Sequence, residues 1–353
     1  MIRLFNLLAV IVCLLSSCSG RTIGSTGSSC RYARWFDIIQ EGRAVVLISP
    51  YDLHRDTVYV NEPMDNIICM SSSQVAALAS IEADSVLTAV SGIGYISNPR
   101  LRERYRTGRN PLYDIGYESS LDYERILKLK PDLLLTYTVS GAEPQFLNKL
   151  RGLGVPIAVL HDHLEDHPLA RAEYIRLAGA LTGRLEKADS LFDHVCEQYL
   201  KIVRSVPKKV DRINVLMNIP YADAWYIPGA DSYMSHLIHD AGGEILGSVT
   251  GRNSKVISIE QAYGLSSDAD IWLNPGHCRT IDDLSRVHQL FPHFGPVKKR
   301  LPIYNNTLRT TPEGGNDFWE SGAVRPDLIL EDLIQVFHYD GGGNLNYYFR
   351  LED

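Results

Sequence analysis

Two matching stretches decide the architecture of this chain: Leu121-Asp122-Tyr123-Glu124-Arg125-Ile126 and Ile257-Ser258-Ile259-Glu260-Gln261-Ala262. In each stretch a glutamate lies where a short helix is predicted to begin. A little further on, an acidic residue precedes a short apolar strand, Leu133-Leu134-Leu135 in the first case and Ile271-Trp272-Leu273 in the second. The repetition predicts two similar lobes, each of which presents one carboxylate to a partner protein.

The N-terminus has the layout of a cleaved export signal. A basic Arg3 precedes an apolar run that is too short to span a bilayer. The run ends in Leu15-Ser16-Ser17-Cys18, which resembles a bacterial lipobox, whose cysteine becomes the lipidated first residue. An ordinary secretory signal with an incidental cysteine is the alternative. We expect residues 1–17 to be a signal peptide, Cys18 to carry lipid and residues 18–30 to form a flexible tether.

Composition and cysteine spacing limit the chemistry of the exported part. The chain has 353 residues and a formal net charge of -7, which is long enough for two domains with separate cores. Lys and Arg form no broad basic face, which argues against nucleic acid as a partner. Cys30, Cys69, Cys196 and Cys278 form no CxxC pair, so neither a zinc site nor a dense disulfide scaffold is indicated. Most of them are predicted to be small buried hydrophobes, and a single disulfide stays open.

Strand and helix patterns alternate along most of the chain. Short β-rich runs at 44–48 and 57–60 predict an N-terminal hairpin. Residues 168–206 differ, because they carry apolar side chains at helical spacing with no strand signal, although Gly179 and Gly183 leave two helices with a bend open. The pattern predicts an α/β fold of two Rossmann-like lobes joined by a single long helix, with a ligand cleft between the lobes. The expected division is an N-terminal extension at 31–65, a first lobe at 66–166, a connecting helix at 167–207, a second lobe at 208–340 and a tail at 341–353.

These features together resemble a known family, the substrate-binding lipoproteins of ABC importers. The lipobox, the phrase from Glu124 to Lys130-Pro131-Asp132-Leu133, the long helix and the Glu260 phrase are similar to those of the helical-backbone metal receptor class, which binds cobalamin, ferric siderophores or haem. Ala224-Trp225-Tyr226-Ile227-Pro228-Gly229 and Arg325-Pro326-Asp327-Leu328-Ile329-Leu330 resemble a Bacteroidetes-type branch. The resemblance implies a class III periplasmic binding protein, with modest hinge motion about the connecting helix.

The resemblance also implies cargo, partners and location. The expected cargo is an iron chelate, either a ferric siderophore or haem. A corrinoid and a free divalent metal ion are the alternative cargoes. A surface adhesion lipoprotein is the alternative function from another class of protein. The partners would be an ABC permease dimer with its ATPase subunits and the membrane through the lipid anchor, with the binding protein itself a monomer, exported and facing the periplasm. No intrinsic cofactor is expected.

In that family one glutamate on each lobe docks with arginines of the permease. By position these glutamates are Glu124 and Glu260. A carboxylate matches the guanidinium fork, and two distant pairs fix orientation as well as register. An acid in the first turn of a helix is also favoured by the helix dipole alone. The pairing of the two glutamates in matched surroundings favours docking.

Candidate ligand contacts lie after the strands of both lobes. Aromatic side chains offer flat apolar faces to a macrocycle or a catecholate, and arginine offers charge to an anionic iron chelate. Packing at the lobe interface is the alternative role for each of them, and Arg325 at a helix start is predicted to be structural. The candidates are Ser71, Ser72, Ser73, Tyr95, Tyr117, Trp225, Tyr226, Arg309 and Trp319.

Two other kinds of site, a metal site formed by histidines and an enzyme active site, are alternatives to a chelate-binding site. His161, His163 and His167 lie among acidic residues before the connecting helix, in a grouping that could bind a metal ion, but we expect them to be solvated linker residues. His236 and His239 are predicted to be partly buried. The sequence has no G-x-S-x-G elbow, P-loop, HExxH or G-x-G-x-x-G, so we expect no enzymatic activity.

Overall fold

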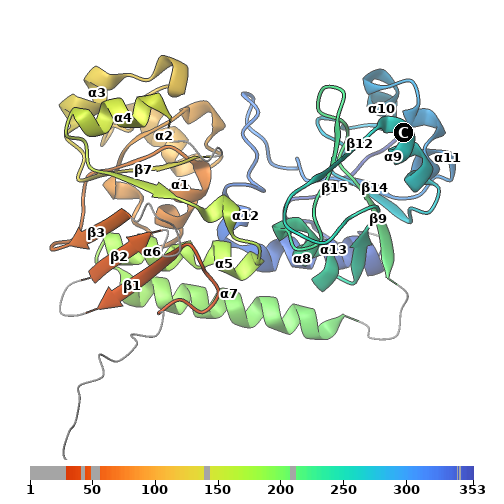
Figure 1. The fold of residues 1–353 in the computed structure, drawn as a ribbon, viewed down its shortest axis with the longest axis horizontal. Coiled ribbons are helices and arrows are strands. Elements are labelled where there is room, and N and C mark those ends of the chain that lie inside the picture. The colour runs from red at the N-terminus through yellow and green to blue at the C-terminus, as the bar shows by residue number, and fades with distance from the viewer. Residues whose placement is uncertain are drawn as a thin grey trace, which may run out of the picture.

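The computed structural model describes residues 29–40, 44–48, 56–138, 144–206, 212–339, 341 and 343–353 (Figure 1). The predicted signal peptide, Cys18 and nearly all of the predicted tether lie outside these residues. In the described part of the chain, no helix combines the length and the apolar character needed to cross a bilayer. Two α/β lobes stand side by side above one long helix, which confirms the predicted fold class.

The first lobe is built on a five-stranded parallel sheet. Alternate residues of the central strand β4 (Ile67–Cys69) enter two separate apolar clusters, so helices cover both faces of the sheet. Burial on both faces explains why these strands are continuous apolar runs in the sequence. The strand order is β6 (Tyr113–Asp114), β5 (Leu87–Val90), β4, β7 (Leu133–Tyr137) and β8 (Ile157–Leu160), and the helices are α1 (Ser72–Ser80), α2 (Pro99–Thr107), α3 (Tyr123–Leu129) and α4 (Gln145–Gly152).

The second lobe repeats this plan with an antiparallel edge strand. Its core is one continuous cluster in which Trp225 and Trp272 are fully buried. The strand order is β11 (Gly243–Ile245), β9 (Ile213–Met217), β13 (Ile271–Leu273), β14 (Ile303–Asn305) and antiparallel β15 (Phe349–Arg350), with a separate ribbon of β10 (Trp225–Ile227) and β12 (Lys255–Ile257). The helices are α8 (Tyr233–Asp240), α9 (Ile259–Ser266), α10 (Ile281–Val287), α11 (Gly295–Lys298) and α13 (Pro326–His338).

The two matching stretches hold equivalent places in the two lobes. Asp132 precedes β7, and its carboxylate accepts the backbone N–H of Asn66 before the neighbouring strand β4 at 3.1 Å. Asp270 precedes β13 and accepts the N–H of Asn214 in the neighbouring strand β9 at 2.8 Å. Asp132 and Asp270, the acids that follow the two matching stretches, therefore each join two adjacent parallel strands at their start. This shared role explains why the two phrases look alike.

The connector is three helices, so the prediction of a single long helix was wrong, whereas the alternative of a bend near Gly179 and Gly183 agrees with the structure. α5 (Pro168–Ala172) and α6 (Tyr174–Leu181) precede α7 (Leu185–Ser205), and the chain turns at Gly183 with a φ of 68°. Gly179 lets α6 and α7 approach closely, because a Cβ there would lie 2.4 Å from the Cβ of Ala188. At 21 residues, α7 is about 30 Å long, and it packs on α6 at one end and α13 at the other.

A second crossing also links the lobes. After β14 the chain passes between the lobes (Figure 1) and returns through α12 (Ser321–Val324), which packs on α1. The Thr311 hydroxyl donates to the carbonyl of Gly94 at 2.6 Å, and the buried carboxylate of Glu320 accepts the N–H groups of Ser97 and Asn98. The segment from Thr311 through α12, which was predicted to belong to the second lobe, thus packs against the first lobe.

Glu320 should make the stability of the protein depend on pH. Burial, followed by the charge of Asp317, raises the pKa of Glu320 from 4.5 to about 7. Between pH values of about 4.5 and 7 the folded state keeps a proton that the unfolded state has released, so this group's contribution to stability falls as pH rises through that window. Urea unfolding of Glu320→Gln at pH 5.5 and 8 should show a pH dependence smaller than that of the wild type by about 1–3 kcal/mol. Glu313→Gln, at a half-exposed position of the same loop, is the matched control, and an unchanged pH dependence in Glu320→Gln would refute this role.

The N-terminal extension is a three-stranded antiparallel sheet. β2 (Ala44–Ile48) pairs with β3 (Asp56–Val60), which confirms the predicted hairpin. The strand β1 (Phe36–Gln40) was not predicted; it pairs with β2 and packs with it on α6. The extension is therefore part of the first lobe's packed structure.

None of the four described cysteines forms a disulfide with another of them. Cys69, Cys196 and Cys278 are buried and Cys30 is partly buried. Burial raises the pKa of each thiol, to about 12 for Cys196 and about 11 for Cys278. The prediction of small buried hydrophobes is confirmed, and no disulfide joins any pair of these four.

Candidate functional site

A row of aromatic side chains follows the carboxyl ends of the first lobe's strands. Tyr95 and Tyr117 meet edge to face with their ring centroids 5.5 Å apart, and both are nearly half exposed. Gly92, with a φ of 69°, makes room for them, because a Cβ there would collide with the Tyr117 hydroxyl. Burial, followed by the neighbouring Tyr95, raises the pKa of Tyr117 to about 12, so the phenol stays protonated.

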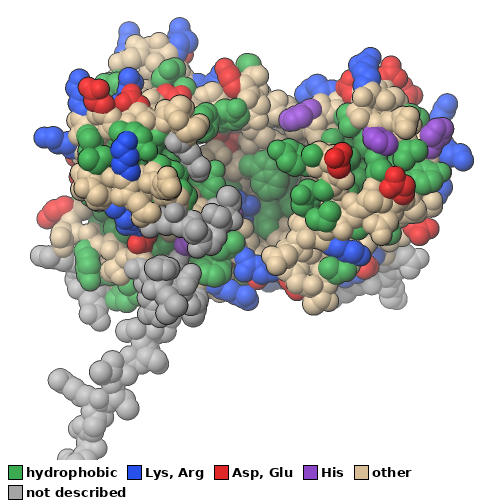
Figure 2. Space-filling view, turned by 45° about the horizontal axis from the view of Figure 1, so that its top comes forward, with side chains coloured by type: hydrophobic (Ala, Val, Ile, Leu, Met, Phe, Trp, Pro, Cys, Tyr) green, Lys and Arg blue, Asp and Glu red, His purple; other side chains and the backbone are tan. Residues whose placement is uncertain are grey.

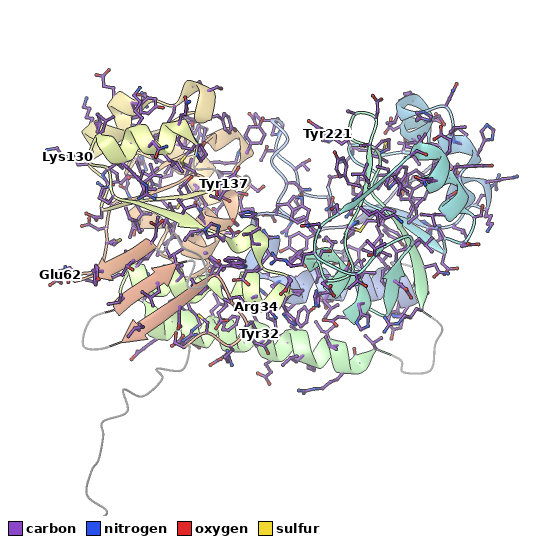
Figure 3. All side chains as sticks on the ribbon, viewed as in Figure 1. Tyr32, Arg34, Glu62, Lys130, Tyr137 and Tyr221 are labelled. Atoms are coloured by element: carbon purple, nitrogen blue, oxygen red, sulfur yellow. The ribbon has the colours of Figure 1, made fainter. Side chains whose placement is uncertain are left out.

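A second line of rings, which together with Tyr95 and Tyr117 is called the aromatic row, lies toward the junction of the lobes. Tyr137 lies 6.2 Å from His163, His163 lies 6.3 Å from His161, and His161 lies 5.8 Å from Trp35, measured between ring centroids. Figure 3 places Tyr137 on the side of the first lobe that faces the second, with Tyr221 across from it. Parallel strands end at one edge of their sheet, which is why residues so distant in sequence form one wall.

An open cavity of about 1270 Å³ lies where the lobes meet. Figure 2 shows the hollow between the lobes, with hydrophobic side chains gathered on its walls. Four parts of the chain line the cavity: the extension, the segment that leads into α5 together with Arg171 of α5, the second lobe, and the second crossing through Trp319. The lining residues are Arg34, Trp35, His163, Leu164, Glu165, Asp166, His167, Arg171, Pro228, Asp231, Ser232, Tyr233, Met234, His236, Gly251, Arg252, Asn253, Ser254 and Trp319.

Arg171 is the central cation of the cavity. Its guanidinium lies 4.6 Å from the ring centre of Tyr233, 6.0 Å from that of Trp319 and 3.7 Å from the Asp162 carboxylate. The Arg171 Nε atom and the Tyr233 hydroxyl are buried without hydrogen-bond partners. Burial raises the pKa of Tyr233 to about 12, so its hydroxyl is a neutral donor. The charge of Arg171 and the aromatic faces of Tyr233 and Trp319 at one cavity wall are suited to an anionic ligand with a flat apolar surface.

A second arginine reaches the cavity from the opposite lobe. Arg252 donates to the backbone carbonyl of Leu164 in the segment before α5. Among the described residues, no carboxylate forms an ion pair with Arg252. Of the three acids in the lining, Asp166 pairs with Arg34 at 3.1 Å, while Glu165 and Asp231 accept backbone N–H groups. The lining thus holds three arginines and three acids, and Arg252 is the arginine that an anionic ligand could pair with.

The histidines before α5 belong to the junction of the lobes, so the expectation of a solvated linker was wrong. His161, His163 and His167 are all partly buried. Burial lowers the pKa of His163, and of His167, below the ordinary value, which favours neutral rings. In the described part of the chain, no group of three or more His, Cys, Asp or Glu side chains is placed to hold a bare metal ion. His236 is partly buried as predicted, whereas His239 is exposed.

The structure places the remaining predicted ligand contacts in three different settings. Trp319 lines the cavity at 40% exposure. Ser73 donates to Asp162 at 2.8 Å and is hydrogen-bonded to Ser71, while Ser72 opens α1, so this triplet supports the carboxylate beside Arg171. Arg309 pairs with Asp317 at 2.8 Å and lies over the Tyr347 ring, away from the cavity lining.

Trp225 requires a correction, because its side chain is 1% exposed. The ring stacks on Trp272 and Phe294, and its N–H donates to the carbonyl of Met217 at 2.9 Å. A role in the core replaces the expected ligand contact. The adjacent Tyr226, on the opposite face of β10, is 42% exposed, as alternation along a strand requires.

Arg325 is structural, as predicted. Its guanidinium forms hydrogen bonds with both carboxylate oxygens of the buried Asp327 in the first turn of α13.

The two docking candidates occupy the same position in their helices. Glu124 lies two residues after the N-cap Asp122 of α3, and Glu260 lies two residues after the N-cap Ser258 of α9. Both are exposed. The pKa of Glu260 lies below its ordinary value, mainly because the Ser258 side chain donates a hydrogen bond to its carboxylate. In Figure 1 α3 and α9 lie on the side of the molecule opposite α7.

Comparison with known proteins agrees with this architecture. A family model described as periplasmic binding protein matches residues 67–289. An uncharacterized lipoprotein of Methanocaldococcus jannaschii is 22% identical over 303 residues, covering 83% of this chain and 70% of the relative.

Solved structures share the fold. The periplasmic heme-binding protein RhuT from Roseiflexus sp. RS-1 superposes with a TM-score of 0.58 at 20% identity, covering 79% of this chain and 100% of that one. The periplasmic vitamin B12 binding protein BtuF of Vibrio cholerae gives 0.56 at 17% identity, with 80% and 99% covered.

Proposed function

Since this chain belongs to the periplasmic binding protein family, we propose that it is the substrate-binding lipoprotein of an ABC importer and that it captures a metal chelate between its lobes. The proposed cargo is an anionic iron chelate, haem or a ferric siderophore, with a corrinoid as the second candidate. Export, lipid attachment at Cys18 and docking through Glu124 and Glu260 are parts of the same proposal.

The junction cavity carries the proposal. Its volume of about 1270 Å³ exceeds the usual range of about 300–1,000 Å³ for small-molecule sites, which favours a bulky organic chelate over a bare ion. The aromatic row from Tyr95 to Trp35 offers flat faces. Arg171 and Arg252 supply charge to an anion. Two of the solved structures that share the fold are named for binding heme and vitamin B12.

The position of the two glutamates supports delivery to a permease. α3 and α9, whose first turns contain Glu124 and Glu260, belong to different lobes, and both helices lie on the side of the molecule opposite α7 (Figure 1). A partner that binds both acids spans the two lobes. Two charge pairs at a distance also fix how the partner is oriented.

Titration of the purified protein tests the binding proposal. Haemin, a ferric catecholate, cyanocobalamin and zinc chloride are added separately while tryptophan fluorescence is followed. Trp35 and Trp319 line the cavity, so a chelate bound there should quench part of the emission at a stoichiometry of one. Binding of zinc together with no response to any chelate would contradict the proposal.

A further inference from the structure

The N-terminal extension lies outside the part of the chain that matches the family, yet it reaches the ligand cavity. The family match begins at residue 67, whereas Arg34 and Trp35 line the cavity. These two residues lie in the segment 29–35, which leads into β1 of the extension sheet.

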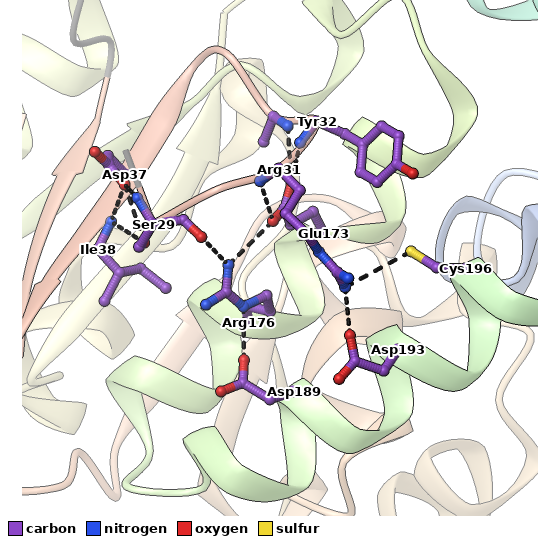
Figure 4. A network of polar contacts seen from close by, with 11 residues as sticks. Ser29, Arg31, Tyr32, Asp37, Ile38, Glu173, Arg176, Asp189, Asp193 and Cys196 are labelled. Carbon is purple, nitrogen blue, oxygen red and sulfur yellow. Dashed lines mark hydrogen bonds and ion pairs between the residues drawn. The ribbon is translucent and has the colours of Figure 1, made fainter. Parts of the chain in front are cut away.

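One buried carboxylate fixes the first half of this segment. Glu173, which is fully buried between α5 and α6, accepts the backbone N–H groups of Arg31, Tyr32 and Ala33, each at 2.8 Å. Arg176 donates to Glu173 at 3.0 Å and to the carbonyl of Ser29 at 2.6 Å, as Figure 4 shows. A buried charge that accepts several hydrogen bonds holds its donors firmly in place.

A second carboxylate fixes the other half. Glu165, at 2% exposure, accepts the N–H groups of Arg34 at 2.9 Å and Trp35 at 3.0 Å. Five consecutive backbone N–H groups, from residue 31 to residue 35, are thus bound by two acids of the connector region. The path of the segment is set by these bonds, and the side chains at its end are held in position relative to the cavity.

The side chains of the segment extend the features that suit a chelate. The Trp35 ring lies 5.8 Å from His161 and ends the aromatic row. Arg34 is two-thirds exposed and uses one nitrogen in its pair with Asp166, so further N–H donors remain for a ligand. Earlier in the segment, Tyr32 stacks on His167 at 5.2 Å.

We propose that the extension forms one wall of the ligand site, in which Trp35 covers a flat face of an anionic organic chelate and Arg34 binds its acidic group. This inference rests on the function proposed above, and it assigns the extension a role in selecting the ligand. Residues before 67 then decide, together with Arg171 and Trp319, which chelate the protein accepts.

The test uses the full-length protein with Trp35→Ala and Arg34→Gln. Each variant is titrated with whichever of haemin, a ferric catecholate and cyanocobalamin the wild type binds. Loss of the stacked ring should weaken binding about tenfold, and loss of the Arg34 charge should weaken binding of an anionic chelate about three- to tenfold. Trp35→Phe should recover most of the loss, because it keeps an aromatic face.

Two controls come from the extension itself. Tyr59→Ala changes an aromatic residue that is 69% exposed on β3. Arg31→Gln removes a charge whose partner is Asp193 on α7 and not a residue of the cavity lining. Both controls should bind within about twofold of the wild type, since such surface changes are nearly neutral.

The outcomes separate this inference from the proposed function. If the wild type binds a chelate and the Trp35→Ala and Arg34→Gln variants bind it as tightly as the two controls, the extension has no part in the site. If the wild type binds none of the chelates, the proposed function fails and this inference fails with it. Arg34 is exposed, so the Arg34→Gln result does not depend on the folding of Trp35→Ala.

Discussion

Replacing both Glu124 and Glu260 by lysine should reduce uptake of the cargo by the cell at least about tenfold while leaving its affinity for the purified protein unchanged. Reversal turns two attractive contacts with the permease into repulsive ones, and truncating one partner of a close interfacial charge pair already costs about 2–5 kcal/mol. Both side chains are exposed and lie on helices outside the cavity lining. Uptake of labelled chelate in cells and titration of the purified variant measure the two quantities.

Glu186→Lys is the matched control for this experiment. Glu186 is also an exposed acid in the first turn of a helix, α7, which lies on the opposite side of the molecule (Figure 1). Glu186→Lys also reverses a charge in the first turn of a helix, so it disturbs a helix dipole in the same way. It leaves the proposed docking side of the molecule unchanged. Uptake should stay at the wild-type level in this control. Normal uptake in the double variant, or an equal loss in the control, would remove Glu124 and Glu260 from docking.

Arg171→Gln should weaken chelate binding about ten- to a hundredfold. A hydrogen bond to a charged group contributes about 1.5–3 kcal/mol, and Arg171 has an unsatisfied Nε beside two aromatic rings of the cavity. Arg171→Lys should lose less, because it keeps the charge but not the planar fork. Fluorescence titration gives the affinities, and thermal unfolding shows whether each variant is folded.

Arg286→Gln is the control for loss of one positive charge. Arg286 is three-quarters exposed on α10 and pairs with Asp283, so its removal should leave affinity unchanged. A folded Arg171→Gln variant with wild-type affinity would place the ligand away from the Arg171 end of the cavity.

Local signals were enough to predict the repeating parts of the fold. Asp132 and Asp270 bind the starts of neighbouring strands, and this contact occurs once in each lobe. Apolar runs such as Leu133 to Leu135 are buried on both faces, so the strands of both lobes are visible in the sequence. Tyr95 and Tyr117 follow strands and Trp319 lies in a loop-rich segment, and all three are partly exposed. Trp319 lines the cavity, whereas Tyr95 and Tyr117 are not among its lining residues.

Residues whose role depends on long-range packing were missed or misplaced. Trp225 has an exposed neighbour at Tyr226, and no local pattern tells which of the two faces the core. His161 to His167 look like a polar linker, yet the junction of the lobes covers them. Arg171 was likewise missed, because a charged residue in a helical segment is usually solvent-exposed, whereas here it lines the cavity.

The second crossing and the extension depend on contacts between segments far apart in the chain. Glu320 meets Ser97 and Asn98 across more than two hundred residues. Glu173 and Glu165 bind the segment 31–35 in the same way. Buried acids that accept backbone N–H groups leave no periodic signal in a sequence, because their partners are main-chain atoms.

An absorption spectrum of the loaded protein tests the central claim most directly. The protein is incubated with haemin, a ferric catecholate, cyanocobalamin and zinc chloride together, and unbound material is removed by gel filtration. The account predicts that one chelate elutes with the protein at about one equivalent, identified by its own absorption bands, and that the Arg171→Gln variant retains far less of it. Elution of the protein with one equivalent of zinc and no chelate absorption would contradict the account.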